Sequence, residues 1–196
     1  MADTRSDAQP DAQPDADDKT LLSLRCVQTM ADGTLDDFRA LVHPEAVNRE
    51  ALREPAASRG RGPAAFHATA LWLRTAFADL RWELQDAVTE GDLVVLHTTM
   101  SGRHVGPFTV YGPDARPVQV FPPTGRSFSV LQTHWCRVKD GLLVEHWANR
   151  DDLGQAQQLG WAPPSPPYLL RMALATAAAR RAARRDQGPG APSPAG

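Results

Sequence analysis

The spacing of apolar residues changes once along this chain, from a helical period to a period of two. Apolar side chains recur every three or four positions in 19–33 and 63–77, which predicts amphipathic helices. From residue 79 they alternate with polar ones, and the breaks at 90–92 and 139–141 have turn composition. Helices followed by antiparallel strands are typical of an α+β domain, with the helices packed on one face of a curved sheet.

The ends of the expected helices can be placed from single residues. Thr34 with Asp37 three positions later forms a capping-box pattern, with Asp in place of Glu, at the start of a second helix. Pro44 is expected to end that helix, and Pro63 suits the first turn of the third. Residues 45–50 are expected to be extended or irregular.

Four segments follow from composition. Residues 1–18 are predicted to be a disordered acidic tail, and 19–162 to be the compact domain. A Pro-rich linker and an Ala/Arg-rich helix are expected over 163–187, with a second disordered tail at 188–196. The helix could pack over a pocket, join a dimer contact or lie against an acidic surface.

The charge and the cysteine pattern exclude several classes of function. A formal net charge of −2 gives no field for binding nucleic acid. There is no secretory h-region and no run of about 18 apolar residues, so we expect a cytoplasmic protein without stable membrane association. Cys26 and Cys136 show no metal spacing and are expected to be core thiols, and no phosphate-loop or zinc motif occurs. We therefore predict neither a metal nor a cofactor.

The strand around His134 carries the first candidate site residue. Alternation gives one face with Val130, Gln132, His134 and Cys136, and another with Leu131, Thr133, Trp135 and Arg137. A histidine facing a pocket can act as a general acid or base near neutral pH. The alternative is a hydrogen-bonded core histidine.

Residues 41–50, 62–108, 121–130 and 133–160, in this order and spacing, resemble the SnoaL-like polyketide and ester cyclases of the nuclear transport factor two-like superfamily. The resemblance covers roughly residues 22–160. It implies a cone, in which a curved antiparallel sheet wraps three helices and leaves one deep apolar pocket. Members of that family cyclise anthracycline precursors by intramolecular aldol condensation without metal or cofactor. Relatives on the same fold open epoxides, isomerise ketosteroids or only bind ligands, so the resemblance predicts the pocket better than the reaction.

The resemblance also shows a departure at residue 148. The family's strand usually reads EHWDxxD, and its first aspartate is the proposed proton shuttle, whereas this chain reads EHWANRD and carries Ala148. A methyl group cannot accept a proton. His134 matches the family's pocket histidine beside that acid, so it is the predicted proton-transfer group.

The register of the hairpin around Lys139–Gly141 decides which residues join His134. A three-residue loop with a glycine bulge places His134 opposite His146, and Gln132 opposite Ala148. A two-residue loop reverses every assignment and brings Glu145, Trp147 and Asn149 to that face instead. The resemblance favours the first register.

Several candidates have an alternative structural interpretation. Asp151 matches the family's second aspartate, but it can simply cap a helix, as can Asp152. Asn48 could orient a carbonyl or enolate oxygen, or bond its own turn. The predicted catalytic residues are His134, His146 and Asp151, and the predicted substrate contacts are Asn48, His104, Phe108, Gln132, Trp135, Glu145 and Trp147.

The sequence thus predicts a cofactor-independent cyclase acting on a hydrophobic, polyketide-like small molecule, and the resemblance suggests a homodimer. A non-catalytic ligand-binding protein on the same fold is the first alternative, supported by Ala148. An epoxide-opening cyclase or hydrolase is the second, and it would need Glu145 or Asp151 within about 5 Å of His134.

Overall fold

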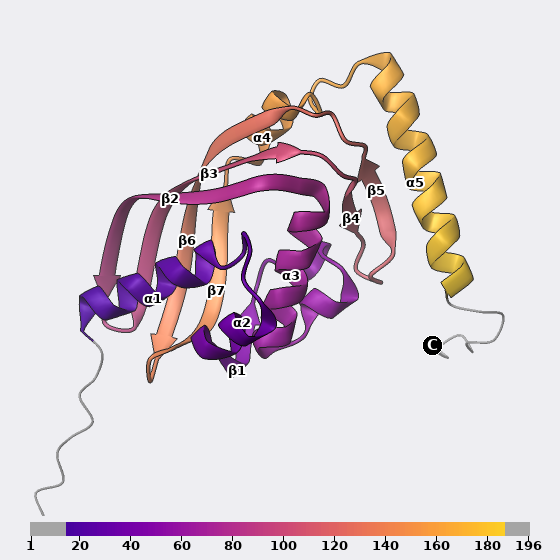
Figure 1. Cartoon of the computed structure of the whole chain (residues 1–196). Helices are drawn as coiled ribbons and strands as arrows, with labels where there is room; N and C mark the ends of the chain where they lie inside the picture. Colours follow the sequence, from indigo (N-terminus) through magenta and orange to yellow (C-terminus); the bar gives the residue numbers. More distant parts are fainter. Residues whose placement is uncertain (1–14, 187–196) are drawn as a thin grey trace, which may run out of the picture.

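The computed structural model describes residues 15–186 (Figure 1). The helices are α1 (Ala16–Gln28), α2 (Leu35–Leu41), α3 (Gly62–Ala76), α4 (Asp152–Leu159) and α5 (Pro166–Asp186), with the short 3₁₀ turns η1 (Ala51–Arg53) and η2 (Ala56–Arg59) before α3. The strands are β1 (Val42–Asn48), β2 (Phe77–Glu90), β3 (Leu93–His104), β4 (Phe108–Tyr111), β5 (Pro117–Phe121), β6 (Ser127–Lys139) and β7 (Leu142–Arg150).

The main sheet confirms the predicted α+β class. Its strand order is β1-β7-β6-β3-β2, antiparallel throughout except for the β1–β7 pair. The sheet curls around α1, α2 and α3, which lie on its concave side (Figure 1). The long Pro/Gly-containing connection between β3 and β6 contains a separate two-stranded sheet, β4–β5.

Helix α2 begins as predicted and ends earlier than predicted. The backbone N–H of Thr34 donates to Asp37 Oδ2 at 2.7 Å, and that of Asp37 donates to Thr34 Oγ at 3.3 Å, so both halves of the capping box are present. The helix stops at Leu41, and Pro44 lies inside β1. A proline is tolerated there because β1 is the edge strand of the sheet.

The β6–β7 hairpin matches neither of the two registers considered from the sequence. Its turn has two residues, Asp140 and Gly141, with φ angles of 51° and 72°, the left-handed values that tight hairpins prefer. Val138 pairs with Leu143 and Arg137 with Glu145, which leaves Val144 as an extra, bulged residue. The bulge shifts the pairing by one residue and so reverses the effect of the short turn.

Beyond the bulge, His134 lies opposite Ala148, and His146 lies opposite Cys136. The predicted pairing of His134 with His146 was therefore wrong by two residues. Because side chains alternate with a period of two, His134, His146 and Ala148 nevertheless share a face.

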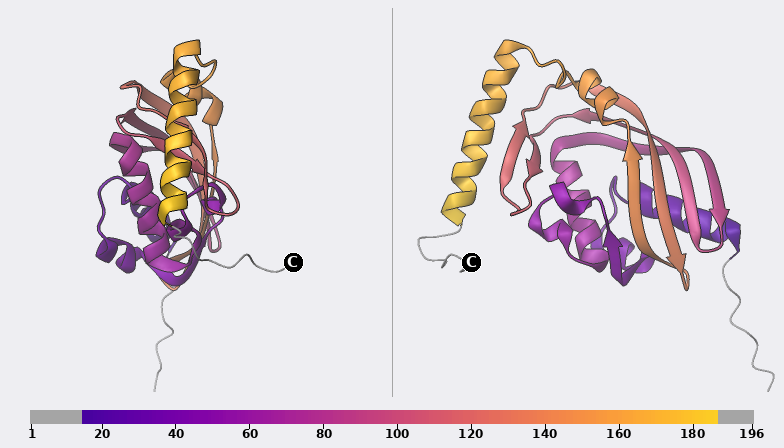
Figure 2. Two further views of the ribbon diagram at one scale, coloured as in Figure 1. Left: turned by 90° about the vertical axis from the view of Figure 1, so that its right-hand side faces the viewer. Right: turned by 180° about the vertical axis from the view of Figure 1, so that it is seen from behind.

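The described ends of the chain also differ from the sequence prediction. Helix α1 begins at Ala16, capped by Asp15, so the ordered part starts inside the segment predicted to be disordered. The remaining tail predictions, for 1–14 and 188–196, lie outside the described residues. Helix α5 packs along β5 (Figure 2), where Thr176 Oγ accepts the N–H of Val120 at 2.9 Å and Arg180 donates to the carbonyl oxygen of Val118 at 2.7 Å.

The hydrophobic core lies between the concave face of the sheet and the three N-terminal helices. Phe38, Phe66, Leu96, Leu143 and Leu159 are its largest fully buried apolar side chains. Cys26 and Cys136 are buried free thiols, as predicted, and burial raises the pKa of Cys136 to about 12. Within residues 15–186, no helix is both long and apolar enough to cross a membrane.

Candidate functional site

The core encloses a cavity of about 670 Å³ between α3, the sheet and the β4–β5 pair. Most of its wall is apolar. The aromatic part of the wall consists of Phe66, Trp72, Phe77, Trp82, Phe108, Phe121 and Trp161. Among these, Phe121 and Trp161 stack with ring centroids 4.3 Å apart, which joins β5 to the segment after α4. Such a cavity suits a mostly apolar small molecule.

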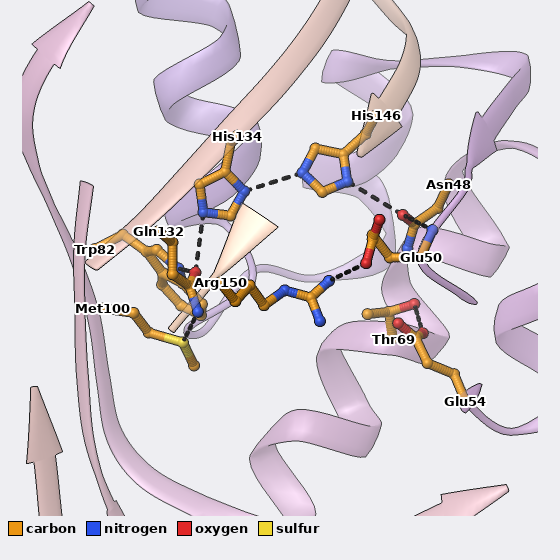
Figure 3. A network of polar contacts seen from close by, with 10 residues as sticks. All are labelled: Asn48, Glu50, Glu54, Thr69, Trp82, Met100, Gln132, His134, His146 and Arg150. Carbon is orange, nitrogen blue, oxygen red and sulfur yellow. Dashed lines mark hydrogen bonds and ion pairs between the residues drawn. The ribbon is translucent and has the colours of Figure 1, made fainter. Parts of the chain in front are cut away.

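A chain of hydrogen bonds crosses one side of the cavity (Figure 3). The indole Nε1–H of Trp82 donates to Gln132 Oε1 at 3.1 Å, and His134 Nε2 lies 3.0 Å from the same oxygen. His134 Nδ1 lies 3.0 Å from His146 Nε2, and His146 Nδ1 lies 3.1 Å from Asn48 Oδ1. Strands β6, β7 and β1 thus bring together two histidines and two amides that are far apart in sequence.

The two ends of this hydrogen-bond chain determine which histidine ring nitrogens carry protons. Gln132 Oε1 already accepts an indole N–H, and Asn48 Oδ1 accepts the backbone N–H of Glu50 at 3.2 Å. Both oxygens are acceptors, so His134 Nε2 and His146 Nδ1 must each donate a proton. The contact between the two rings needs one proton more. A neutral histidine pair carries two ring protons and is therefore one proton short of satisfying its three contacts.

Burial keeps the pair neutral at rest. Burial first, and then the nearby positive charge of Arg150, lower the pKa of His134 to about 3. The pKa of His146 is lowered well below its usual value, first by burial and then by His134 and Arg150. The hydrogen-bond geometry favours a third proton, whereas desolvation of the charge opposes it, and desolvation dominates without an anion in the cavity. The pair is thus arranged to receive a proton when negative charge develops beside it.

Ala148 leaves this part of the cavity without a carboxylate. It is buried and lies opposite His134. Two residues further along the same face, Arg150 lines the cavity and forms an ion pair with Glu50 at 3.3 Å. Position 148 itself is therefore neutral, while the nearby charges of Arg150 and Glu50 are paired with each other, and an aspartate at 148 would have had both His134 and Arg150 as neighbours.

Five of the predicted site residues line the cavity: Asn48, Phe108, Gln132, His134 and His146. Three others do not: Trp135 faces away from His134 by alternation along β6, and its partner Trp147 and Glu145, which pairs with Arg137, lie on the same convex face of the sheet. Trp135 and Trp147 stack there at 5.8 Å, and Glu145 pairs with Arg49 and with Arg137. The expectation that Trp135, Glu145 and Trp147 contact substrate is corrected by this placement.

Asp151 and His104 also lie outside the cavity wall. Asp151 accepts the backbone N–H of Gly154 at 2.8 Å and caps α4, which is the structural alternative considered from the sequence. His104 was expected at a pocket rim, but it is fully buried, with its Nδ1 3.3 Å from Thr124 Oγ. Its ring packs behind the aromatic wall, 5.1 Å from the ring of Trp161, and burial lowers its pKa.

Glu54 lines the cavity and was not singled out from the sequence. It follows η1 in a segment whose Gly, Arg and Pro content predicted only a loop, and loop residues carry no periodicity that would reveal burial. Its Oε2 lies 2.5 Å from Thr69 Oγ of α3. Among residues 15–186, no group of three or more His, Cys, Asp or Glu side chains is placed to hold a metal ion.

Comparison with known proteins gives the family. The sequence model of the SnoaL-like polyketide cyclases matches residues 20–159, most of the chain. The chain belongs to this family. The relatives of this SnoaL-like protein include the aklanonic acid methyl ester cyclase DnrD of Streptomyces peucetius, 34% identical over 143 residues that cover 72% of this chain and 90% of the relative. The nogalonic acid methyl ester cyclase of Streptomyces nogalater is 31% identical over 135 residues, covering 68% and 91%.

A solved structure gives the same result. TsrD from Streptomyces laurentii superposes with a TM-score of 0.60 at 30% identity, covering 76% of this chain and 98% of TsrD. The family expected from the sequence is thereby confirmed, together with its α+β fold.

Proposed function

We propose that this SnoaL-like protein closes a ring in a hydrophobic polyketide ester by intramolecular aldol addition, with no metal or cofactor. The observation that carries the proposal is the neutral His134–His146 pair set into the wall of an apolar cavity of about 670 Å³. The relatives are named as methyl ester cyclases of aklanonic and nogalonic acid, and these names supply the substrate class of the proposal.

The reaction needs a base, an electrophile held close to it and little water. An apolar cavity removes water from the substrate and holds its reacting carbons near each other, so less of the barrier is entropic. The histidine pair takes a proton from a carbon activated by neighbouring carbonyl groups. The resulting enolate attacks a ketone carbon of the same molecule, and a carbon–carbon bond closes the ring.

The pair can act as base in spite of Ala148. The unprotonated nitrogens, His134 Nδ1 and His146 Nε2, face each other at rest, so one ring turns toward the substrate to accept its proton. When that ring turns back, all three contacts between Gln132 and Asn48 are satisfied for the first time. The enolate that forms beside the pair offsets the cost of a buried positive charge. Gln132 and Asn48 act by holding the rings, and proton transfer is assigned to His134 and His146.

Purified protein incubated with aklanonic acid methyl ester and with nogalonic acid methyl ester tests the proposal. Aldol addition conserves mass, so the product is followed by chromatographic shift and by NMR of the new ring carbons. The uncatalysed rate is measured in the same buffer without protein. Binding of both esters without enhanced cyclisation of either would contradict the proposal.

A ligand-binding role is the second candidate, and Ala148 is the observation that favours it. Such a protein binds the esters and leaves them unchanged. The Ala148→Asp variant separates the two functions. Gain of cyclisation by the variant over an inactive wild type would establish a binder, whereas an active wild type would establish the enzyme.

The epoxide-opening alternative lacks the cavity carboxylates that it was expected to need. It needed Glu145 or Asp151 close to His134, and neither residue lines the cavity. We do not propose it.

Two further expectations belong to the same proposal: cytoplasmic location and assembly as a homodimer. The convex face of the main sheet supports the dimer, because Val88 and Leu131 are exposed there. Sedimentation equilibrium of the full chain, compared with a Leu131→Lys variant, measures the assembly. An unchanged monomer mass for both proteins would contradict it.

A further inference from the structure

Glu54 is the one buried carboxyl group among the Asp and Glu residues of 15–186, with 4% of its surface exposed. It lines the cavity from the segment between η1 and η2, whereas the histidine pair lines it from β6 and β7. In Figure 3 the Arg150–Glu50 ion pair lies between the two groups. The cavity therefore has titratable side chains on two separate parts of its wall.

The backbone at Glu54 is held rigidly. The guanidinium of Arg59 donates two hydrogen bonds to the carbonyl oxygen of Glu54, at 3.0 and 2.9 Å. The same guanidinium donates to the carbonyl oxygens of Gly112 and Pro113 at 2.7 and 2.8 Å. Three segments meet at one cation, so the position of the Glu54 side chain is fixed before any ligand enters, as catalysis by positioned groups requires.

The partner of the carboxyl group suits both of its protonation states. Thr69 Oγ lies 2.5 Å from Glu54 Oε2 and 3.4 Å from the carbonyl oxygen of Ala65. When Glu54 is ionised, the hydroxyl donates to it. When Glu54 is protonated, its own O–H can donate to Thr69 Oγ while the hydroxyl proton turns to Ala65. The site can therefore give up a proton and take one back without rearranging.

Burial of Glu54 shifts its equilibrium toward the acid form. Burial, the largest cause, raises its pKa, and Glu50 raises it as well, whereas Thr69, Arg150 and Ser58 lower it. Arg150 is already paired with Glu50, which reduces what it can do for a second carboxylate. A purely structural contact to Thr69 would be served as well by an uncharged glutamine, at a smaller desolvation cost.

We propose that Glu54 is the proton donor of the ring closure, delivering its proton to the ketone oxygen while the histidine pair takes the proton from carbon. This inference rests on the proposed cyclase function. Glu54 and the histidine pair would thus share the two proton transfers that one aspartate at position 148 would otherwise perform.

The step is balanced. A C–H bond breaks and its proton goes to the histidine pair, and the electron pair it leaves forms the new carbon–carbon bond. The π pair of the ketone moves to its oxygen, which takes the Glu54 proton to become an alcohol. The protonated histidine pair and the Glu54 carboxylate then return to their resting states by net transfer of one proton, so nothing is oxidised or reduced.

The test compares Glu54→Gln with wild type in the full chain. Glutamine keeps the shape and a contact to Thr69 but has no proton to give. We expect kcat to fall by about 100-fold or more with KM changed little, since general acid catalysis contributes roughly 10²–10⁴. Loss of the high-pH limb of the wild-type kcat profile should accompany the change. Glu83→Gln, an exposed carboxyl on β2, is the matched control and should leave both constants unchanged.

Infrared spectroscopy gives a readout that needs no substrate. At neutral pH, wild type should show the C=O stretch of a protonated carboxylic acid, and Glu54→Gln should lack it. Absence of this band in wild type, or full kcat in Glu54→Gln, would overturn the proposal for Glu54 while leaving the cyclase intact. A wild type that shows the band but cyclises no ester would instead refute the proposed function, and the role of Glu54 as donor with it.

Discussion

The two faces of the β6–β7 hairpin are formed by neighbouring residues but place their polar side chains in opposite environments. On the concave face, His134 and His146 are removed from water and bonded in series to neutral amides. On the convex face, Glu145 is paired with Arg49 and Arg137, which are both half exposed or nearly so. The proposed proton transfer lies on the face where charge is costly, and the ion pairs lie where water screens them.

The difference shows that environment, more than residue type, sets the behaviour of a polar side chain. On both faces, polar side chains connect β6 to β7. Burial is the main cause that lowers the pKa of His134 to about 3 and that of His146 well below its usual value, whereas partly exposed ion pairs such as those of Glu145 contribute about 0–1 kcal/mol each. The register of the pairs beyond the bulge determines which residues meet which environment.

Inserting one alanine between Glu145 and His146 should produce the largest effect, because it shifts the pairing by one residue and exchanges the faces of the residues that follow. Trp147 would then enter the core, and His146 would leave it. We expect loss of more than about 3 kcal/mol of unfolding free energy, beyond the range of most single changes. Urea denaturation followed by circular dichroism measures it. Deleting Val144 instead removes the bulge but keeps every pair beyond it, from Arg137–Glu145 on, and should cost far less. Equal stability of the insertion variant and the wild type would show that the register does not set the faces.

The His134→Ala variant changes only the concave face, where it removes one member of the histidine pair. Cyclisation should slow by roughly 10²–10⁴-fold, the usual contribution of a positioned base, with the fold retained. Initial rates with the two methyl esters measure the loss. Trp135→Phe, one residue along on the convex face, is the control and should keep nearly full activity. Equal rates for His134→Ala and wild type would remove His134 from the reaction.

The pH dependence of stability sharpens the comparison. The pKa of His134 is about 3 in the folded chain against 6.5 in the unfolded chain, so the unfolded state binds protons first as pH falls. Its contribution to stability is complete above pH 6.5 and is lost as pH falls toward 3. Between pH 7 and pH 5 we expect a loss of about 2 kcal/mol from this residue.

Glu54 works in the opposite direction, because its raised pKa lets the folded state hold a proton that the unfolded state releases. Comparing wild type with His134→Gln isolates the histidine, since Glu54 is common to both. Unfolding free energies at the two pH values should differ less in the variant. An identical pH slope in both proteins would mean that His134 is not desolvated.

Glu145→Gln should have the smallest effect, because it breaks only exposed ion pairs of the convex face. We expect less than about 1 kcal/mol at low salt and less still at high salt. Thermal melts at two ionic strengths measure this difference. Loss of cyclase activity in this variant would show that the convex face takes part in the reaction.

The sequence predicted the features that depend on local pattern. The change of period gave the order of helices and strands, and Thr34 with Asp37 gave the start of α2. The family resemblance gave the cone and placed His134, His146 and Asn48 in the cavity wall. Asp151 as a helix cap was one of two alternatives stated, and the structure places it there.

What could not be predicted depends on contacts between distant segments. A two-residue turn followed by a bulge at Val144 has the same parity as a three-residue loop, so alternation alone gave the right face with the wrong partners. Burial of Glu54 depends on Arg59 joining its loop to residues 112 and 113. His104 lies at a strand end that composition marks as exposed, and the packing of Phe77 and Trp161 against its ring covers it.

The two-stranded sheet β4–β5 has different neighbours on its two sides. Gln119 and Phe121 point into the cavity, while Val118 and Val120 of the same strand contact α5 through Arg180 and Thr176. Any movement of β5 that widens the cavity must therefore displace α5 or break these bonds. The stiffness of this wall, and so the size of molecule that can pass it, is set by a helix none of whose residues lines the cavity.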